Sequence, residues 1–427
     1  MLLAVVRYNT PTASGRISRG MKILILTQYF PPETGAAQNR LFELAVRLKS
    51  LGADITVLTA MPNYPQMQIY DEYEGLTYVY EEIGGLKVHR SSIYVSSDRS
   101  VISRLKNYFS FVLSSWRTAK KKLGRFDVIL CESPPLFLGY TAMWLARRMR
   151  AKLIFNVSDL WPETAEKLGV ITNRFLLDRA YVLEEKIYRR SALVTGQTQG
   201  ICRSIDERFP EVRTYWLPNG VDLDYYDPAK IDAGDWRSRH KISKDDIVFL
   251  YAGILGIGQG LEVILKAAER HLPNRAVRFV LLGDGPEKNK LLALKDQLRL
   301  DNVLLLDPVP KKEMPSILKS CNATIIPLKK IDLYKGAIPS KAFECMGMQL
   351  PILLGVDGEA RELFIDNGKC GLYFEPENEQ ELADAVAKLA SSAALRDELG
   401  RNGRRYVAEH FNRDRIAQSF FEELEKL

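Results

Sequence analysis

From Met21 onward, short runs of apolar residues alternate with longer stretches in which apolar residues recur every three or four positions. This alternation is typical of a parallel sheet that carries helices on both faces. In the first half of the chain it predicts one complete doubly wound unit, whose first helix ends at Gly52. The strands expected in this unit are 23–27, 55–59, 127–131, 153–157 and 193–195.

The pattern changes at Pro218 to Asp222, where turn residues replace the periodic positions and predict an interdomain linker that reaches Pro228. A second unit of the same kind follows. Its expected strands are 247–252, 277–282, 303–306, 323–327 and 352–354. The spacing of four apolar residues near the end of the chain predicts a last helix: Ile416, Phe420, Phe421 and Leu424.

The sequence therefore predicts an α/β protein of two doubly wound, Rossmann-like domains that face each other across a cleft. We expect these domains at 21–222 and 223–410, and we expect the final segment, 411–427, to pack back on the first domain. Residues 1–20 show no sustained period, so we expect a disordered extension and take Met21 as the natural start.

Composition excludes several classes of protein. A chain of 427 residues with 46% hydrophobic and 26% charged residues is ordinary for globular domains and unlike a disordered, collagenous or disulfide-scaffold protein. The longest apolar stretch, 136–146, is too short to span a bilayer. The five Cys and four His are scattered without metal-ligand spacing, which predicts a reduced compartment and no structural zinc.

The net charge of +7 is unevenly distributed, since 221–427 contains 30 basic and 33 acidic residues and the excess lies in the N-terminal half. Residues 99–125 hold eight basic residues and no acidic one. Within this stretch, helical spacing places Val101, Leu105, Tyr108, Val112 and Trp116 on one face. Such a helix can lie in an anionic membrane interface, or it can be an amphipathic helix packed on the sheet. The charge favours the membrane, with these contacts expected: Arg104, Lys106, Trp116, Lys120, Lys121 and Lys122. No nucleic-acid recognition motif accompanies them.

Glycines follow the first strand of the second domain. The loop 253–260 holds four of them, including Gly253 and Gly256, together with Gln259. Glycines let the backbone approach a phosphate closely, although a flexible turn has the same composition. In the next loop, Asp284 could accept a hydrogen bond from a ligand hydroxyl, but capping of a helix started by Pro286 is the favoured interpretation.

A third loop, 327–344, combines several groups suited to a nucleotide. Ser340 is expected to cap a helix, Lys335 and Lys341 supply positive charge, and Glu344 lies one turn into the helix, where it can bind ribose hydroxyls. A solvated lysine-rich loop with a glutamate that compensates the helix dipole is the alternative; it explains the lysines, but it explains the whole constellation poorly. In the first domain, Asp159 and Glu163 flank Trp161 after a strand and form a candidate acceptor or catalytic site; packing and first-turn helix charge are the alternatives.

These residues resemble family 4 retaining glycosyltransferases of the GT-B fold, from Met21 to the C-terminus. The resemblance is carried by Gly35, Pro-Asn-Gly-Val-Asp at 218–222, Tyr-Ala-Gly with Gln-Gly-Leu at 251–261, Gly-Asp-Gly-Pro at 283–286, and Pro-Ser-Lys-Ala-Phe-Glu at 339–344. The segments 159–163 and 334–341 look most like the branch that builds bacterial surface polysaccharides, including N-acetyl-L-fucosamine transferases.

The resemblance implies donor binding in the second domain and acceptor binding in the first. Glu344 matches the ribose-binding glutamate, and Ser340 and Lys341 match the positions whose amides hold the diphosphate. Val309 falls where the family's backbone meets the base. Asp159 and Lys341 are the expected catalytic residues; Glu33, Gly35 and Glu163 are expected near the acceptor.

Three features of the family pattern are missing from this sequence. The first glutamate of its Glu-x7-Glu motif falls at Gly336, which suggests a deoxy or N-acetylated sugar. The usual basic pair falls near Ile254 and Gln259, and a lysine common in this branch falls at Ile257, so Lys335 or Lys341 must meet the diphosphate charge.

The resulting hypothesis is an enzyme that moves a sugar from a UDP-linked donor to a polyprenyl-diphosphate-linked saccharide, without a metal or other cofactor. It is expected in the cytoplasm, peripheral on the inner face of the plasma membrane. Two alternatives are a non-catalytic GT-B subunit that binds membrane or a partner enzyme, and a nucleotide-sugar epimerase of similar fold.

Overall fold

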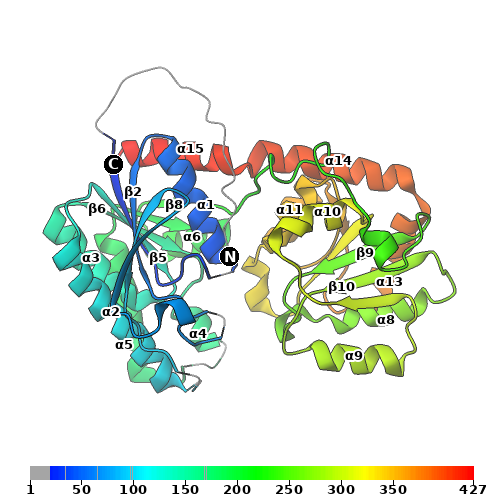
Figure 1. The fold of residues 1–427 in the computed structure, drawn as a ribbon, viewed down its shortest axis with the longest axis horizontal. Coiled ribbons are helices and arrows are strands. Elements are labelled where there is room, and N and C mark those ends of the chain that lie inside the picture. The colour runs from blue at the N-terminus through cyan, green and yellow to red at the C-terminus, as the bar shows by residue number, and fades with distance from the viewer. Residues whose placement is uncertain are drawn as a thin grey trace. The chain divides into compact units, whose positions relative to one another are not determined.

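The computed structural model describes residues 20–427, with the exception of residues 34, 65, 97, 99, 168 and 170. It also leaves out the side chains of Ala36 and Val101. The expected N-terminal extension therefore lies outside the described residues, apart from Gly20, and so does Arg99 of the basic stretch. The described chain forms two compact units, one of residues 20–218 with 414–427 and one of residues 219–413 (Figure 1).

The first unit is built on an eight-stranded sheet, counted over the described residues, in the order β3-β4-β2-β1-β5-β6-β7-β8. All neighbouring strands are parallel except the hairpin of β3 and β4. The strands are β1 Lys22–Leu26, β2 Asp54–Ala60, β3 Tyr78–Ile83, β4 Leu86–Ser91, β5 Val128–Ser133, β6 Lys152–Val157, β7 Leu193–Gly196 and β8 Thr214–Trp216.

Helices cover both faces of this sheet. One face carries α2 Val101–Lys122, α3 Gly139–Met149, α5 Arg174–Arg190 and α6 Gln199–Arg208, whose buried side chains share one core. The other face carries α1 Ala36–Ser50 and α15 Arg413–Glu425. Phe420 and Leu424 of α15 pack in the core formed by β1 and α1, so the end of the chain belongs to the first unit. A short helix, α4 Glu163–Lys167, follows β6.

The second unit has six strands within the described residues, all parallel, in the order β11-β10-β9-β12-β13-β14. This is the 3-2-1-4-5-6 order of dinucleotide-binding folds. The strands are β9 Ile247–Ala252, β10 Val277–Leu282, β11 Val303–Leu306, β12 Ala323–Pro327, β13 Ile352–Gly355 and β14 Gly371–Tyr373. Their nearly continuous apolar sequences follow from burial on both faces.

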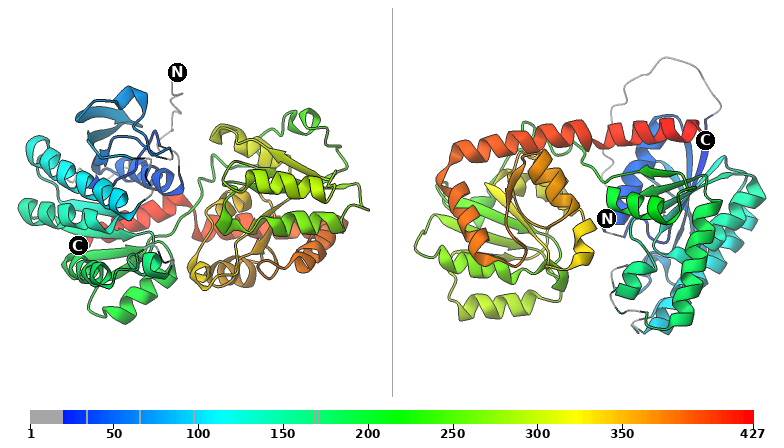
Figure 2. Two further views of the ribbon diagram at one scale, coloured as in Figure 1. Left: turned by 90° about the horizontal axis from the view of Figure 1, so that it is seen from below. Right: turned by 180° about the vertical axis from the view of Figure 1, so that it is seen from behind.

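Most helices of the second unit connect its strands, and the last two follow β14 and lead to α15 (Figure 2). They are α7 Trp236–Arg239, α8 Glu262–Arg270, α9 Lys288–Gln297, α10 Met314–Lys319, α11 Lys341–Gly347, α12 Glu359–Arg361, α13 Glu379–Ser391 and α14 Ala393–His410. Asn378 caps helix α13, because its Oδ1 accepts from the Glu381 amide and its Nδ2 donates to the Glu381 carboxylate.

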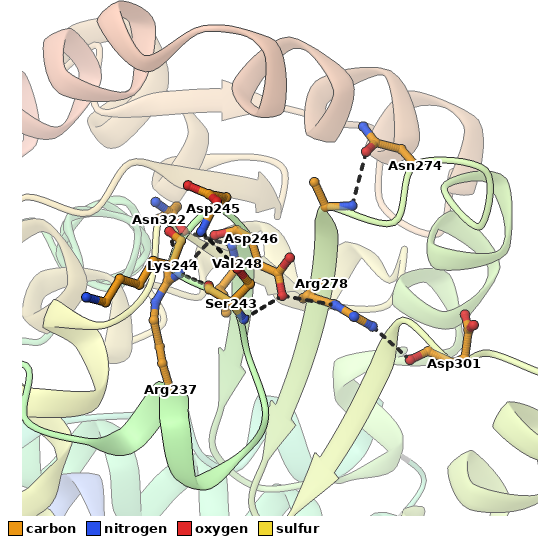
Figure 3. A network of polar contacts seen from close by, with 11 residues as sticks. Arg237, Ser243, Lys244, Asp245, Asp246, Val248, Asn274, Arg278, Asp301 and Asn322 are labelled. Carbon is orange, nitrogen blue, oxygen red and sulfur yellow. Dashed lines mark hydrogen bonds and ion pairs between the residues drawn. The ribbon is translucent and has the colours of Figure 1, made fainter.

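Arg237 ties together the amino ends of the strands in this sheet (Figure 3). Its guanidinium donates to the carbonyls of Asp246 at 3.0 Å and Ser320 at 2.8 Å, and to Oδ1 of Asn322 at 2.8 Å. That same amide oxygen accepts from the Val248 amide at 2.8 Å. The network therefore joins the starts of β9 and β12 at the edge opposite to the loops that carry the candidate site.

Candidate functional site

The strand order of the second unit reverses between β9 and β12, and such a switch point leaves a crevice at the carboxyl ends of the two strands. The loop 253–260 follows β9, and the loop 328–340 follows β12. The two loops are joined by a hydrogen bond of 2.9 Å from the Lys329 amide to the Gly258 carbonyl. The predicted donor residues therefore come from the loops that the topology brings together.

Close backbone packing explains why glycines are needed here. Gly253 and Gly283 have φ values of +144° and +153°, which other residues rarely adopt. A Cβ atom on Gly283 would collide with the Gly253 carbonyl. The Leu255 amide donates to the Asp284 carbonyl at 2.8 Å, so the loop after β10 supports the loop after β9. The glycines thus build a layered backbone surface rather than a loose turn.

Lys341 places its cation against this surface. Its Nζ would lie 2.7 Å from a Cβ on Gly253, and it stands 3.9 Å from the centroid of the Tyr251 ring. Burial lowers the pKa of Lys341 to about 8, against a smaller opposing influence of Cys345 and Glu344. The site therefore holds a desolvated lysine whose protonated form an anionic ligand would stabilise.

Glu344 lies one turn after Lys341 on α11 and is partly buried. It is next to Tyr226, whose hydroxyl pKa is raised by burial and by the Glu344 carboxylate. The structure thus places a cation and a carboxylate at adjacent positions of one short helix, at the switch point. Sequence reasoning identified both residues but gave no role to their aromatic neighbours, since Tyr251 entered only as part of the Tyr-Ala-Gly motif and Tyr226 was missed.

Ser340 occupies the N-cap position of α11, but its side chain makes no capping hydrogen bond, so the expected cap is wrong in that respect. The amides of Ala342 and Phe343 donate to the carbonyls of Pro339 and Ser340. The amides of Ser340 and Lys341 make no backbone hydrogen bond within the part of the chain that the structure describes.

Asp284 does not cap a helix. Helix α9 begins at Lys288 with Glu287 in the N-cap position, and the exposed Asp284 carboxylate lies 3.8 Å from Lys288 Nζ. The favoured capping interpretation is therefore wrong, and the carboxylate faces solvent near the glycine loop.

The other expected donor residues lie on three loops that follow β9, β11 and β12. Gln259 is half-buried, with its side chain against Gly256, and Val309 is half-buried in the loop after β11. Lys335 is exposed and forms an ion pair of 2.8 Å with Asp332. Lys341 is therefore better placed than Lys335 to bind a diphosphate. The side chains of Ile254 and Ile257 are 61% and 59% exposed.

In the first unit, Asp159 follows β6 and accepts a hydrogen bond of 2.7 Å from the Thr164 hydroxyl. Glu163 begins α4 and pairs with Lys167 at 2.5 Å. Gly35 is the N-cap residue of α1. Asp159 and Glu163 are both partly exposed and close in sequence, at the carboxyl edge of the sheet.

Glu33 has a different role from the expected contact with an acceptor. Its carboxylate is buried and accepts from the amides of Phe30 at 3.0 Å, Asn63 at 2.8 Å and Tyr64 at 2.9 Å. Burial raises the pKa of Glu33, and these hydrogen bonds oppose the rise. We therefore assign Glu33 to holding the loops after β1 and β2 together.

A buried polar network behind Asp159 was missed from the sequence. Arg40 donates to Glu132 at 2.7 Å and to Ser158 at 2.6 Å, and Asn156 donates to the same carboxylate at 2.5 Å. The available signal was Glu132, an acid within an otherwise apolar strand. The network fixes the turn that carries Asp159.

The apolar stripe of helix α2 was expected to contact a membrane or, as the alternative, the sheet, and it is not the face that the helix buries. Its fully buried residues are mostly small or polar: Ser103, Asn107, Phe111, Ser115 and Ala119. Leu105, Tyr108, Val112 and Trp116 are only half-buried. The cations expected at a membrane are exposed, namely Arg104, Lys106, Lys120, Lys121 and Lys122.

Two searches of the described residues gave negative results. No described helix is long and apolar enough to cross a membrane. Across the described ranges, no group of three His, Cys, Asp or Glu side chains is arranged to hold a metal ion.

Comparisons with known proteins fit both units. The family model "Glycosyl transferase 4-like domain" matches residues 35–220, and "Glycosyl transferases group 1" matches residues 232–406. A putative colanic acid biosynthesis glycosyl transferase of Escherichia coli is 25% identical over 328 residues, 75% of this chain and 80% of the relative. An uncharacterised glycosyltransferase of Methanocaldococcus jannaschii is 22% identical over 93% of this chain and 96% of its own length.

Solved structures share the fold. Sucrose-phosphate synthase from Thermosynechococcus elongatus aligns with a TM-score of 0.74 at 16% identity, over 95% of this chain and 98% of that one. The Anabaena protein HepE, in complex with UDP and glucose, aligns with a TM-score of 0.70 at 19% identity, over 95% and 100%. The protein is therefore a glycosyltransferase with the GT-B fold. It belongs to family 4 of these enzymes, which confirms the expected fold class and the resemblance at that level.

Proposed function

We propose that this enzyme transfers a sugar from a UDP-linked donor to a lipid-linked saccharide, with retention of anomeric configuration, during assembly of a bacterial surface polysaccharide. The observation that carries the donor half is the juxtaposition of Lys341 with the Gly253 backbone at the β9/β12 switch point, one helical turn before Glu344. A structural neighbour that binds UDP and a relative named for colanic acid biosynthesis support the choice of donor and pathway class.

In this proposal, Lys341 stabilises the diphosphate that leaves, and Glu344 binds the ribose hydroxyls. The lysine is already desolvated, so its charge acts through a medium of low dielectric constant and needs little reorganisation as negative charge develops on the leaving oxygen. The acceptor oxygen attacks the anomeric carbon from the face that the diphosphate leaves, the bond from that carbon to the diphosphate oxygen breaks, and the hydroxyl proton passes to the leaving oxygen as UDP is released. Asp159 positions that acceptor. No resident metal or other cofactor is expected, because Lys341 is proposed to balance the charge of the leaving diphosphate.

The donor sugar is proposed to be a deoxy or N-acetylamino sugar. Gly336 occupies the place where the family carries a carboxylate that binds sugar hydroxyls, and a Cβ there would meet nothing within 4 Å. This open space can accommodate a bulkier or less polar sugar substituent.

The enzyme is proposed to work at the inner face of the plasma membrane, with α2 against anionic lipid. Its five cysteines are all free and buried, as suits a reduced compartment. An exposed helix with six cations and no acid suits an anionic bilayer.

Calorimetric titration with UDP and a panel of UDP-sugars tests the donor assignment. The expected result is binding of UDP at one site per chain and loss of that binding in Glu344→Ala, with an unchanged melting temperature. Glu362→Ala, an exposed carboxylate of the same unit, is the matched control and should bind like the natural protein. Undiminished UDP affinity in Glu344→Ala would refute the ribose role, and no binding of any nucleotide would refute the donor site.

A further inference from the structure

Large apolar side chains are unusually exposed on three helices of the first unit. Of the fourteen most exposed large apolar residues in the described part of the chain, seven lie on α2, α3 and α5, each between 41% and 68% exposed. They are Ile102, Phe109, Leu113, Tyr140, Phe175, Leu176 and Val182. Several exposed apolar side chains on helices that contact one another indicate an interaction surface, whereas single exposed apolar residues are normal.

The three helices form one layer. Their inward residues Phe111, Leu145 and Leu183 share a single core under the same face of the sheet, and α3 contacts both α2 and α5. Figures 1 and 2 show the three long helices along one side of the first unit. Their outward residues therefore face away from the sheet in a common direction.

The layer also has a direction along the helices. Helices α2, α3 and α5 end shortly before β5, β6 and β7 begin, so their C-terminal ends lie at the amino edge of the sheet and their N-terminal ends lie toward the carboxyl edge. All seven exposed apolar residues precede the last third of their helix. The final turns instead carry cations: Lys120, Lys121 and Lys122 on α2, Arg147 and Arg148 on α3, and Arg189 and Arg190 on α5.

Charge distinguishes the possible occupants of this face. The three helices carry thirteen basic residues and three acidic ones, and one of those acids, Glu184, is buried. None of the six cations of α2 forms an ion pair with a described residue. On α5, Arg189 pairs with Glu185 and Glu211, so α2 provides most of the uncompensated charge.

Compensation of the helix dipole would explain cations in the last turns. It does not explain apolar side chains left in water at the other ends. A second copy of this face would bring two strongly positive surfaces together, which is unfavourable. An anionic bilayer satisfies both features, because apolar side chains enter the acyl boundary while cations meet the headgroups.

We propose that α2, α3 and α5 together form one membrane-binding face, with its apolar part toward the sheet edge that carries Asp159 and its basic part at the opposite edge. The occupant is the surface of a bilayer that contains anionic lipid. The proposal extends the membrane contact beyond α2 and orients the acceptor loops toward the lipid. It rests on the proposed function only for the lipid-linked nature of the acceptor.

Vesicle flotation of the full chain tests this face without any substrate. We expect the natural protein to float with vesicles of phosphatidylcholine and 30% phosphatidylglycerol, more weakly at 0.5 M NaCl. The variant Phe109→Ser/Phe175→Ser/Val182→Ser should lose at least tenfold in binding. The matched control Leu76→Ser/Tyr80→Ser/Leu292→Ser removes apolar residues that are also exposed but lie on other elements, and it should float normally.

A fluorescent probe tests the direction of the face. All five natural cysteines are buried, so the single variants Phe109→Cys and Lys121→Cys can be labelled selectively with an environment-sensitive dye. Vesicles should shift the emission of the dye at position 109 to the blue, with a smaller shift at position 121. Failure of the natural protein to float, equal loss in the control, or a dimer that the triple face variant dissolves would overturn the proposal. UDP binding is measured by calorimetry without vesicles. A protein that binds UDP but does not float would therefore refute the membrane face and leave the proposed donor site intact.

Discussion

The proposed role of Lys341 predicts how nucleotide affinity depends on pH. Burial lowers the pKa of this lysine from 10.5 to about 8 in the free enzyme. A UDP diphosphate bound beside Nζ would favour the charged lysine and raise that pKa again. Affinity should therefore be greatest while the free lysine is protonated, below pH 8, and should fall above it.

The size of the effect follows from the shift. A fall from 10.5 to about 8 corresponds to about 3 kcal/mol that disfavours the protonated lysine in the free site. Between its free and bound pKa values, each pH unit weakens binding by about tenfold, or about 1.4 kcal/mol. In the free protein, the lowered pKa of Lys341 reduces the free energy of unfolding below pH 8, where the lysine is charged in both the folded and the unfolded chain. This loss of stability disappears as the pH rises toward 10.5, because the lysine is then neutral in both states. Contact with the Tyr251 ring, worth about 0.5–2 kcal/mol, offsets part of it.

Calorimetry of UDP binding between pH 7 and 9.5 measures the dependence directly. We expect constant affinity up to about pH 8 and about tenfold weaker binding at pH 9. Lys341→Met should bind at least tenfold more weakly at pH 7, show no pH dependence in this range, and melt no lower than the natural protein. Lys335→Met, which alters an exposed lysine, should keep the natural pH profile. A flat profile in the natural protein, or natural affinity in Lys341→Met, would refute the reasoning.

Three further predictions concern other parts of the chain. Arg237→Ala should lower the free energy of unfolding by about 3 kcal/mol, because three partly buried hydrogen bonds between strand ends are lost. Arg239→Ala, which removes an exposed ion pair, should lower it by about 0.5 kcal/mol; equal losses in urea unfolding would contradict the role of Arg237 in joining the strand ends. Glu33→Gln should cost about 1 kcal/mol, because one amide loses its acceptor while the burial of a charge is relieved, and a change in acceptor KM without lower thermal stability would show that the carboxylate binds acceptor after all. Asp159→Asn should leave UDP affinity unchanged and lower kcat at least 100-fold, whereas Glu163→Gln should change kcat only a few-fold. Similar kcat values in the two variants would show that Asp159 does not position the acceptor.

Much of the fold could be predicted from the sequence because strands buried on both faces are nearly continuous apolar runs. The strands β9 and β10 were expected at their observed bounds. The hairpin of β3 and β4 was missed, because β3 is a partly exposed edge strand with a mixed pattern. Its signal was Gly84-Gly85, both with positive φ, as a two-residue hairpin turn requires. The three-residue strands β8 and β14 are too short to show a pattern.

Helix α2 shows where periodicity is insufficient. Spacing identified an apolar stripe, but the helix buries small and polar residues that form hydrogen bonds with other elements. For example, Asn107 Oδ1 accepts a hydrogen bond of 2.9 Å from Gln28 Nε2. Which stripe faces the sheet depends on these tertiary contacts, and they are not visible in local sequence. The contact of Lys341 with Gly253 likewise depends on the strand order, although each residue was singled out alone. The roles assigned to Asp159, Lys341 and Glu344 stay predictions.

The central claim is that this chain transfers a sugar from a UDP-linked donor through the Lys341 and Glu344 site. The direct measurement is UDP release from a panel of UDP-sugars in the presence of a lipid-linked saccharide, with the anomeric configuration of the product determined by proton NMR. We predict acceptor-dependent UDP release from at least one deoxy or N-acetylamino donor, the same anomeric configuration in product and donor, and no release by Glu344→Ala. Product of inverted configuration, or equal turnover in Glu344→Ala, would contradict the account.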